Sequence, residues 1–103
     1  MRTKFSVQGT STKEYTEADI LKAVKHHLKD TGWYCMRIQQ ALGCHKGISD
    51  LIAIKDGITM FVETKSPKWR GKLNPDQVEF KKQVEKHGAI FVLIDKMDQV
   101  EGL

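Results

Sequence analysis

Apolar residues follow a helical period near the start of the chain. They recur three to four residues apart along one stripe: Ile20, Leu21, Val24 and Leu28. Thr16 stands just before this stripe as a good helix N-cap, and Asp19 lies three residues later, as in a capping box. The pattern predicts a helix that begins near Thr16 and is terminated by Gly32.

A second helix is predicted in the C-terminal half of the chain. Pro75 suits the first turn of a helix, and Asn74 suits the capping position before it. The helical segment runs to about His87, and Gly88 terminates it.

Strand-like segments surround the second helix. Residues 49–55 and 58–65 flank Asp56-Gly57, a pair preferred in two-residue hairpin turns. Residues 33–39 form a further strand-like segment of mixed chemistry, and residues 89–95 form an almost wholly apolar one. Residues 40–48 and 66–75 are predicted loops. The order of helix, three strands, helix and strand predicts an α/β fold in which helices cover a sheet.

The length of 103 residues is that of one domain. We expect residues 1–13 to be a flexible lead-in and residues 14–103 to form a single domain. No stretch approaches the roughly 20 apolar residues that span a bilayer, and the polar N-terminus lacks the apolar segment of a signal peptide. A cytoplasmic protein is therefore expected.

The net charge and the two cysteines say little about which partner or metal the protein binds. A net charge of +4 and a pI near 9.1 are compatible with a polyanionic partner such as nucleic acid. The two cysteines, Cys35 and Cys44, have histidines nearby, but no CxxC or HxxxH spacing typical of structural zinc sites occurs. Ordinary strand and loop cysteines are the favoured interpretation.

The predicted hairpin brings two acids together. If Asp56 and Gly57 form the turn, Asp50 lies directly across from Glu63, and Lys65 shares their face of the sheet. Apolar residues on both faces of the hairpin indicate that both faces are covered. Two opposed carboxylates repel each other unless a cation lies between them, and hard oxygen ligands suit Mg²⁺ or Mn²⁺.

Each predicted helix carries one polar residue on its apolar stripe. Glu17 lies on the stripe of the first helix and should point towards the sheet, where an unpaired carboxylate is costly. Gln77 shares a stripe with Phe80 and Val84 on the second helix. The alternatives are that Glu17 is a first-turn acid favoured by the helix dipole and that Gln77 is a boundary residue.

Three ordered motifs resemble the virus-type replication-repair nuclease (VRR-NUC) domain of the PD-(D/E)XK superfamily. They are Gly47-Ile48-Ser49-Asp50-Leu51, Glu63-Thr64-Lys65-Ser66-Pro67 and Leu73-Asn74-Pro75-Asp76-Gln77. The resemblance covers residues 17–95 and implies a restriction-endonuclease-like α/β fold with a central mixed sheet flanked by helices. Ser49 and Thr64 depart from the family, which often has proline and an aliphatic residue there.

The resemblance implies a metal-dependent endonuclease that hydrolyses phosphodiester bonds of DNA. Asp50, Glu63 and the backbone carbonyl of Thr64 would hold Mg²⁺ or Mn²⁺, and Lys65 would orient or deprotonate the attacking water. It also implies that Glu17 supports a second metal or its water shell, and that Gln77 supports the lysine or the active-site water.

Basic residues near the motifs are candidate DNA contacts. The predicted loop after the Glu-x-Lys motif combines positive charge with an aromatic ring: Lys68, Trp69, Arg70 and Lys72. Lys46, before Asp50, is a weaker candidate of the same kind. The alternative is an ordinary solvated loop.

The expected working unit is a homodimer. One small domain carries one candidate metal site, whereas duplex or branched DNA presents two strands, and two-fold dimers are the commonest assemblies. The resemblance also suggests a viral or mobile-element origin and action on branched DNA such as Holliday junctions. Residues 90–94 could form the interface at a sheet edge, or be a buried central strand. The alternative functions are an inactive nucleic-acid-binding module and a small protein-interaction domain.

Overall fold

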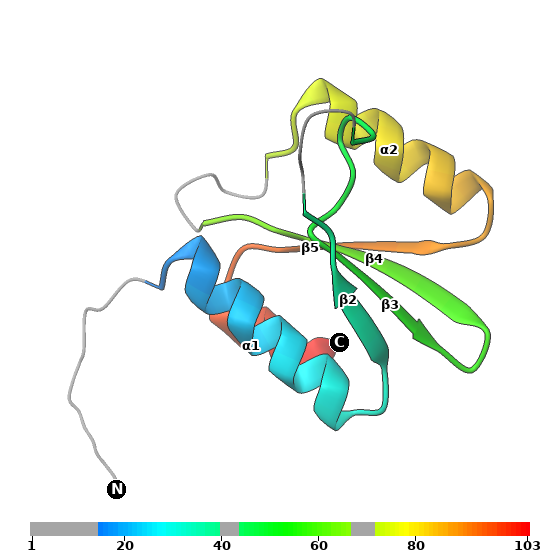
Figure 1. Ribbon diagram of the computed structural model, residues 1–103. Helices are drawn as coiled ribbons and strands as arrows, with labels where there is room; N and C mark the ends of the chain where they lie inside the picture. Colours follow the sequence, from blue (N-terminus) through cyan, green and yellow to red (C-terminus); the bar gives the residue numbers. More distant parts are fainter. Residues whose placement is uncertain (1–14, 40–43, 67–71) are drawn as a thin grey trace, which may run out of the picture.

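The computed structural model describes residues 15–39, 44–66 and 72–103 (Figure 1). Its elements follow the predicted order, with a short 3₁₀ helix added at the end: α1 (Glu17–Asp30), β2 (Tyr34–Arg37), β3 (Leu51–Lys55), β4 (Ile58–Thr64), α2 (Pro75–Lys86), β5 (Ile90–Ile94) and η2 (Met97–Gly102). The predicted lead-in, residues 1–13, lies outside the described residues.

The described residues form one four-stranded mixed sheet with the strand order β2-β3-β4-β5. β2, β3 and β4 pair antiparallel, whereas β5 pairs parallel to β4 after the crossover through α2. β5 therefore lies at an edge of this sheet, and its interpretation as a central strand is wrong.

The predicted register of the β3–β4 hairpin is confirmed. Leu51 pairs with Val62 and Lys55 with Ile58 around the turn, where Asp56 and Gly57 have φ angles of 51° and 79°. Positive φ at both central residues is what a type I′ hairpin turn requires. A Cβ added at Gly57 would meet no atom of the described residues within 4 Å.

The strands are shorter than predicted where side chains replace backbone partners. β3 begins at Leu51 rather than at residue 49, because the Ser49 hydroxyl donates to the Leu51 carbonyl (2.9 Å). The backbone N–H of Thr64 donates to the Asp50 carboxylate (2.8 Å), so the regular ladder ends at the Leu51–Val62 pair. Asp50 consequently stands just outside the strand.

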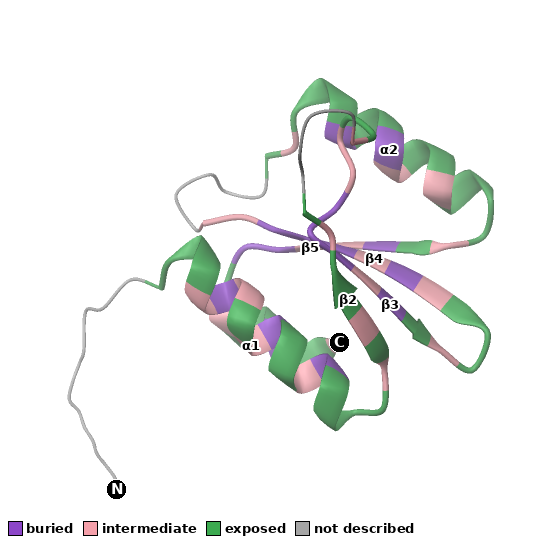
Figure 2. Ribbon diagram, in the orientation of Figure 1, coloured by how far each residue is buried: buried purple, intermediate pink, exposed green. Residues whose placement is uncertain are grey.

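α1 covers one face of the sheet (Figures 1 and 2). Thr16 and Asp19 form the predicted capping box, each accepting a backbone N–H of the other. The core on this side joins α1, the sheet and η2 through nine buried side chains: Ile20, Val24, Leu28, Leu51, Ala53, Met60, Val62, Ile94 and Val100.

α2 lies on the opposite face and is held there by aromatic rings. Phe80 packs edge-on against Phe61 of β4 (centroids 5.1 Å apart) and against Phe91 of β5 (6.3 Å). The β2–β3 side of this face is open, since Tyr34 and Ile54 are 69% and 40% exposed. The prediction that both faces of the hairpin are covered is therefore wrong for its outer half. No helix in the described ranges has the length and apolar character needed to cross a membrane.

Candidate active site

Three chain segments meet at the end of the hairpin that lies away from its turn. The loop before β3 supplies Asp50, the end of β4 supplies Glu63 and Lys65, and the first turn of α2 supplies Gln77. Asp50, Glu63 and Gln77 are all buried, with 9%, 4% and 7% of their surface exposed. The structure thus gathers four of the five side chains that the sequence singled out.

Asp50 is held by the strand opposite it. One carboxylate oxygen, Oδ2, accepts the Thr64 backbone N–H (2.8 Å) and the Thr64 hydroxyl (2.9 Å). The sequence motif did not reveal this second bond. Its signal was the departure at Thr64 from the family's aliphatic residue, since a hydroxyl here provides a donor for the acid.

Glu63 has its two carboxylate oxygens in different environments. Oε2 accepts Nε2 of Gln77 (2.9 Å) and lies 3.8 Å from Nζ of Lys65. Oε1 is buried and has no hydrogen-bond partner among the described residues. A buried carboxylate oxygen without a partner is costly unless a cation or a proton compensates it.

The electrostatics of the site favour a proton on Glu63 when no metal is bound. Burial, the largest cause, and the neighbouring Asp50 carboxylate together raise the pKa of Glu63 from 4.5 to about 7. The Lys65 ammonium lowers the pKa, while the charge of Glu17 adds to the upward shift. Glu63 therefore exchanges a proton in the neutral range, where a divalent cation can compete for the same site.

Gln77 is fixed by the cap of α2. Its Oε1 accepts the backbone N–H of Asn74 (2.9 Å), and the Asn74 side chain accepts the backbone N–H of Gln77 in return. Because this bond uses the amide oxygen, the amide nitrogen must face Glu63. The sequence had suggested the lysine or a water network as its partner, and the structure instead gives Glu63 itself.

Gly47 allows the loop that carries Asp50 to dock on α2. Its φ is +77°, and a Cβ there would lie 2.2 Å from the backbone oxygen of Asp76 and 2.8 Å from the backbone nitrogen of Gln77. Only glycine permits both the left-handed backbone and this close approach. The Gly-x-x-Asp motif therefore places Asp50 against the same helix turn that presents Gln77.

Glu17 does not follow the expectation that it points into the sheet. It is exposed in the first turn of α1, and α1 buries Ile20, Val24 and Leu28 instead. In the described parts of the chain no third acid, histidine or cysteine joins Asp50 and Glu63 in a ready metal cluster. Glu17 is nevertheless near enough for its charge to act on Glu63.

The predicted DNA contacts are only partly described. Lys68, Trp69 and Arg70 lie outside the described residues. Lys46 and Lys72 are exposed, and both lie in segments that lead to the site, Lys46 four residues before Asp50 and Lys72 five residues before Gln77.

The donor set fits Mg²⁺ or Mn²⁺. Two adjacent carboxylates, one with an unpartnered buried oxygen, provide hard oxygen ligands. Mg²⁺ commonly uses only one or two carboxylates and keeps water or substrate phosphate at its other positions. Two protein acids are therefore enough for such a cation.

Solved structures with the same fold are known. One, described as a "VRR_NUC domain", matches with a TM-score of 0.72 and 23% identity, over 86% of this chain and 95% of that one. Another, described as a "VRR_NUC domain protein", matches with a TM-score of 0.69 and 21% identity, over 87% of this chain and 85% of the other. No family model and no curated protein matches the sequence. The chain shares the mixed α/β fold of these VRR_NUC domains.

Proposed function

We propose that this protein is a metal-dependent nuclease that hydrolyses phosphodiester bonds of DNA. The observation that carries the proposal is the buried Oε1 of Glu63, which has no partner among the described residues, beside the Asp50 carboxylate and with Lys65 Nζ 3.8 Å from the other oxygen of Glu63. Ion pairs that serve stability alone do not require two adjacent buried acids, because the acids repel each other. The fold shared with VRR_NUC domains supports a nuclease-type domain.

Asp50, Glu63 and the backbone carbonyl of Thr64 would hold Mg²⁺ or Mn²⁺. Such an ion, when bound, polarises the scissile phosphate and lowers the pKa of a coordinated water. Thr64 keeps Asp50 in place through two hydrogen bonds, and Gln77 keeps Glu63 in place through one. These bonds use Asp50 Oδ2 and Glu63 Oε2, so Oδ1 of Asp50 and Oε1 of Glu63 are the carboxylate oxygens left for the cation.

Lys65 would act on the reacting groups. Its side chain is 18% exposed, so its ammonium can meet a substrate phosphate while its charge stays partly shielded from water. It would orient the attacking water and stabilise the negative charge that develops on the phosphate. Glu17, exposed near the site, would support a second ion or its water shell.

The positive charge of the chain would serve substrate binding. Lys46 and Lys72 lie close in sequence to Asp50 and Gln77, and Lys68, Trp69 and Arg70 follow soon after the Glu-x-Lys motif in the sequence. Branched DNA is the proposed preferred substrate and a homodimer the proposed working unit, since two copies would address two strands.

Cleavage assays with defined DNA substrates test the proposal. The protein is incubated with linear, flapped and four-way-junction DNA in EDTA, Mg²⁺ or Mn²⁺. We expect cleavage only with a divalent ion, and loss of cleavage in Asp50→Ala and Glu63→Ala. Asp98→Asn, which removes an exposed acid in η2, is the matched control and should cleave normally.

Titration with Mn²⁺ separates a lost metal site from a lost fold. Asp50→Ala should remain folded but lose tight Mn²⁺ binding. Metal-independent cleavage, or Mn²⁺ binding unchanged by Asp50→Ala, would contradict the proposal. Metal-independent DNA binding without any cleavage would instead favour an inactive nucleic-acid-binding module.

A further inference from the structure

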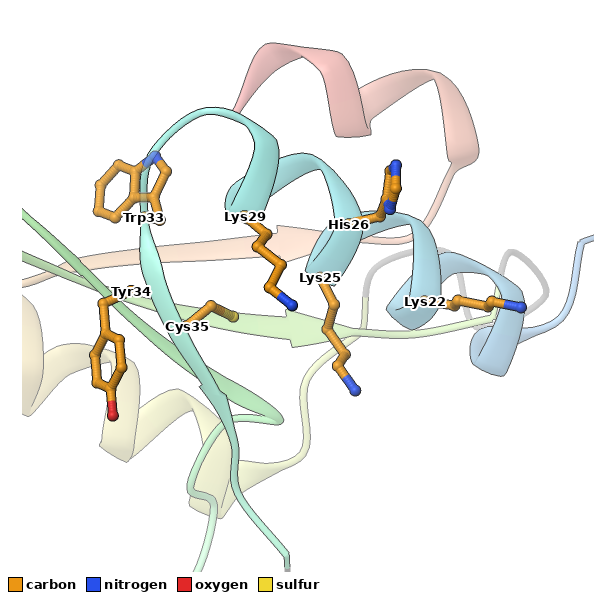
Figure 3. Close-up of a pocket in the computed structure, with 7 residues that line it drawn as sticks. All are labelled: Lys22, Lys25, His26, Lys29, Trp33, Tyr34 and Cys35. Carbon is orange, nitrogen blue, oxygen red and sulfur yellow. The ribbon is translucent and has the colours of Figure 1, made fainter.

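A groove of about 400 Å³ lies between α1 and the edge strand β2 (Figure 3). It lies at the β2 edge of the sheet, where Cys35 faces α1 and Tyr34, paired with Ile54, points to the opposite face (Figure 3). Three lysines of α1 and three consecutive residues around the start of β2 line it: Lys22, Lys25, Lys29, Trp33, Tyr34 and Cys35. None of these residues has a role in the active site described above.

The groove carries positive charge without matching acids. Lys22, Lys25 and Lys29 lie three and four residues apart and therefore share one face of α1. None of them makes a salt bridge within the described ranges, whereas His26 beside them is paired with Asp30 (3.2 Å). Like charges at this spacing repel each other, so the stripe is slightly unfavourable until an anion binds it.

Two of the three lysines lie near the strand that forms the other wall of the groove. Figure 3 shows Lys25 and Lys29 extending from α1 alongside the strand that carries Cys35. Burial raises the pKa of the Cys35 thiol, and the Lys25 ammonium opposes this shift, as expected for a charge that lies close to the strand. The positive charge is thus directed into the groove.

Aromatic rings stand at the start of the same strand. Tyr34 is 69% exposed, so most of its ring is accessible to a ligand. Trp33 is half-buried against the core, and Nζ of Lys55 lies 6.0 Å from the centre of its ring. Lys55 Nζ also donates to the Thr31 carbonyl (2.6 Å), which keeps the ammonium beside the Trp33 ring. Phosphate-binding lysines beside stackable rings are the chemistry that binds an unpaired nucleic-acid strand.

We propose that the groove between α1 and β2 binds a single-stranded segment of the nucleic-acid substrate, which passes over the β2 edge with its phosphates against the lysines and a base on Tyr34. This deepens, and rests on, the nuclease function proposed above. An unpaired strand fits better than a duplex, because the faces of paired bases are hidden in the stack. The natural source of such a strand is the arm or flap of a branched substrate.

The position of α1 connects the groove to the active site. Its first turn carries Glu17, whose charge acts on Glu63, and the lysine stripe begins at Lys22 and ends at Lys29. At 1.5 Å per residue the stripe is about 10 Å long, and it leads away from the site along the helix axis. A strand leaving the cleaved phosphate can follow this path.

Binding measured without divalent ions tests the groove independently of catalysis. A fluorescent oligo-dT and a duplex of equal length are titrated with the protein in EDTA, with anisotropy as the readout. We expect Lys25→Gln/Lys29→Gln to weaken oligo-dT binding and to reduce the slope of log affinity against log salt by about 1.4, or about 0.7 per lost phosphate contact. Lys82→Gln/Lys86→Gln is the matched control, because these exposed lysines have the same spacing on α2.

Variants of Tyr34 test the stacking. Tyr34→Ala should weaken oligo-dT binding at least about five-fold, whereas Tyr34→Phe, which keeps the ring, should bind normally. Equal losses in both lysine pairs, an unchanged salt slope, or no binding of oligo-dT would overturn the groove proposal. A loss on duplex as large as that on oligo-dT would overturn its specificity for a single strand. None of these results depends on cleavage, so the nuclease proposal stands or falls separately.

Discussion

Gln77 donates from Nε2 to Oε2 of Glu63 across 2.9 Å, while its own Oε1 accepts the backbone N–H of Asn74. One amide therefore caps α2 and orients the acid at the centre of the candidate site. Phe80 lies three residues after Gln77 in α2, and Phe61 lies two residues before Glu63 in β4. The contact between these two rings holds α2 against β4 next to the Gln77–Glu63 hydrogen bond. The contacts between α2 and β4 therefore set both the packing of α2 on the sheet and the position of the Glu63 carboxylate.

The variant Gln77→Glu separates the two roles of Gln77, capping α2 and orienting Glu63. A glutamate keeps the acceptor for Asn74 but places a second carboxylate against Glu63, which should raise the Glu63 pKa further. We expect Mn²⁺ binding to require a higher pH in the variant, measured by calorimetric titration across pH 6–9. Gln83→Glu is the matched control, since Gln83 donates in the same way to the exposed Glu79 (2.8 Å). Identical pH profiles would reduce Gln77 to a helix cap.

The raised pKa of Glu63 predicts how stability depends on pH. The folded protein holds this proton up to about pH 7, whereas the unfolded chain releases it near 4.5. The contribution is therefore fully present below pH 4.5 and is lost as the pH rises through about 7, and it is on the order of 3 kcal/mol. Urea unfolding in EDTA should show this loss in the wild type and not in Glu63→Gln. Saturating Mn²⁺ should reduce the loss, because a cation compensates the ionised acid.

Lys65 should be required for cleavage and dispensable for metal binding. Its ammonium is not a metal ligand at neutral pH, but it lies 3.8 Å from Glu63 at the edge of the site. We expect Lys65→Ala to reduce the cleavage rate by about 100-fold or more while Mn²⁺ binding persists. Lys82→Ala, an exposed lysine of α2, provides the control. Near-normal turnover of Lys65→Ala would reject the assigned role.

Gly47→Ala should damage the fold and the site together. The new Cβ would meet the backbone of Asp76 and Gln77, and φ at this position is unfavourable for alanine. We expect a loss of roughly 1–3 kcal/mol or more in the free energy of unfolding, together with weaker Mn²⁺ binding. Gly57→Ala has a similar φ of +79° but open space, so it isolates the backbone strain from the clash. Equal effects of the two changes would contradict the docking role of Gly47.

The homodimer is testable by mass. Light scattering at micromolar concentration should give about twice the chain mass of 11.8 kDa. β5 is an edge strand and Ile90 in it is 44% exposed, so Ile90→Lys should weaken association by placing charge at that edge. Ile58→Lys, at a similarly exposed position (47%) in β4, is the control. A mass near 11.8 kDa with full activity would show that one chain suffices.

Local signals in the sequence were sufficient to predict the helices and strands and the register of the β3–β4 hairpin. Thr16 and Asp19, like Asn74 and Pro75, act within one helix turn, so they mark helix starts without reference to the rest of the fold. The Asp56-Gly57 turn fixes which residues of β3 and β4 face each other, and from this the closeness of Asp50 and Glu63 follows.

Contacts between distant segments could not be predicted in the same way. The exposure of Glu17 depends on the angle at which α1 crosses the sheet, and the edge position of β5 depends on the crossover through α2. The partner of Gln77 depends on how α2 packs through Phe80. The lysine stripe of α1 is visible in the sequence, but the groove exists only because β2 runs beside it.

The turn at Asp56 and Gly57 and the pair of acids stand at opposite ends of one hairpin. With about 3.3 Å of rise per residue, five residues of β3 separate the two by roughly 15 Å or more. The turn is also exposed, and Gly57 has open space around it among the described residues. A fluorophore, an immobilising tether or an inserted peptide can therefore be attached there, at a site whose chemistry takes place at the far end of the strands.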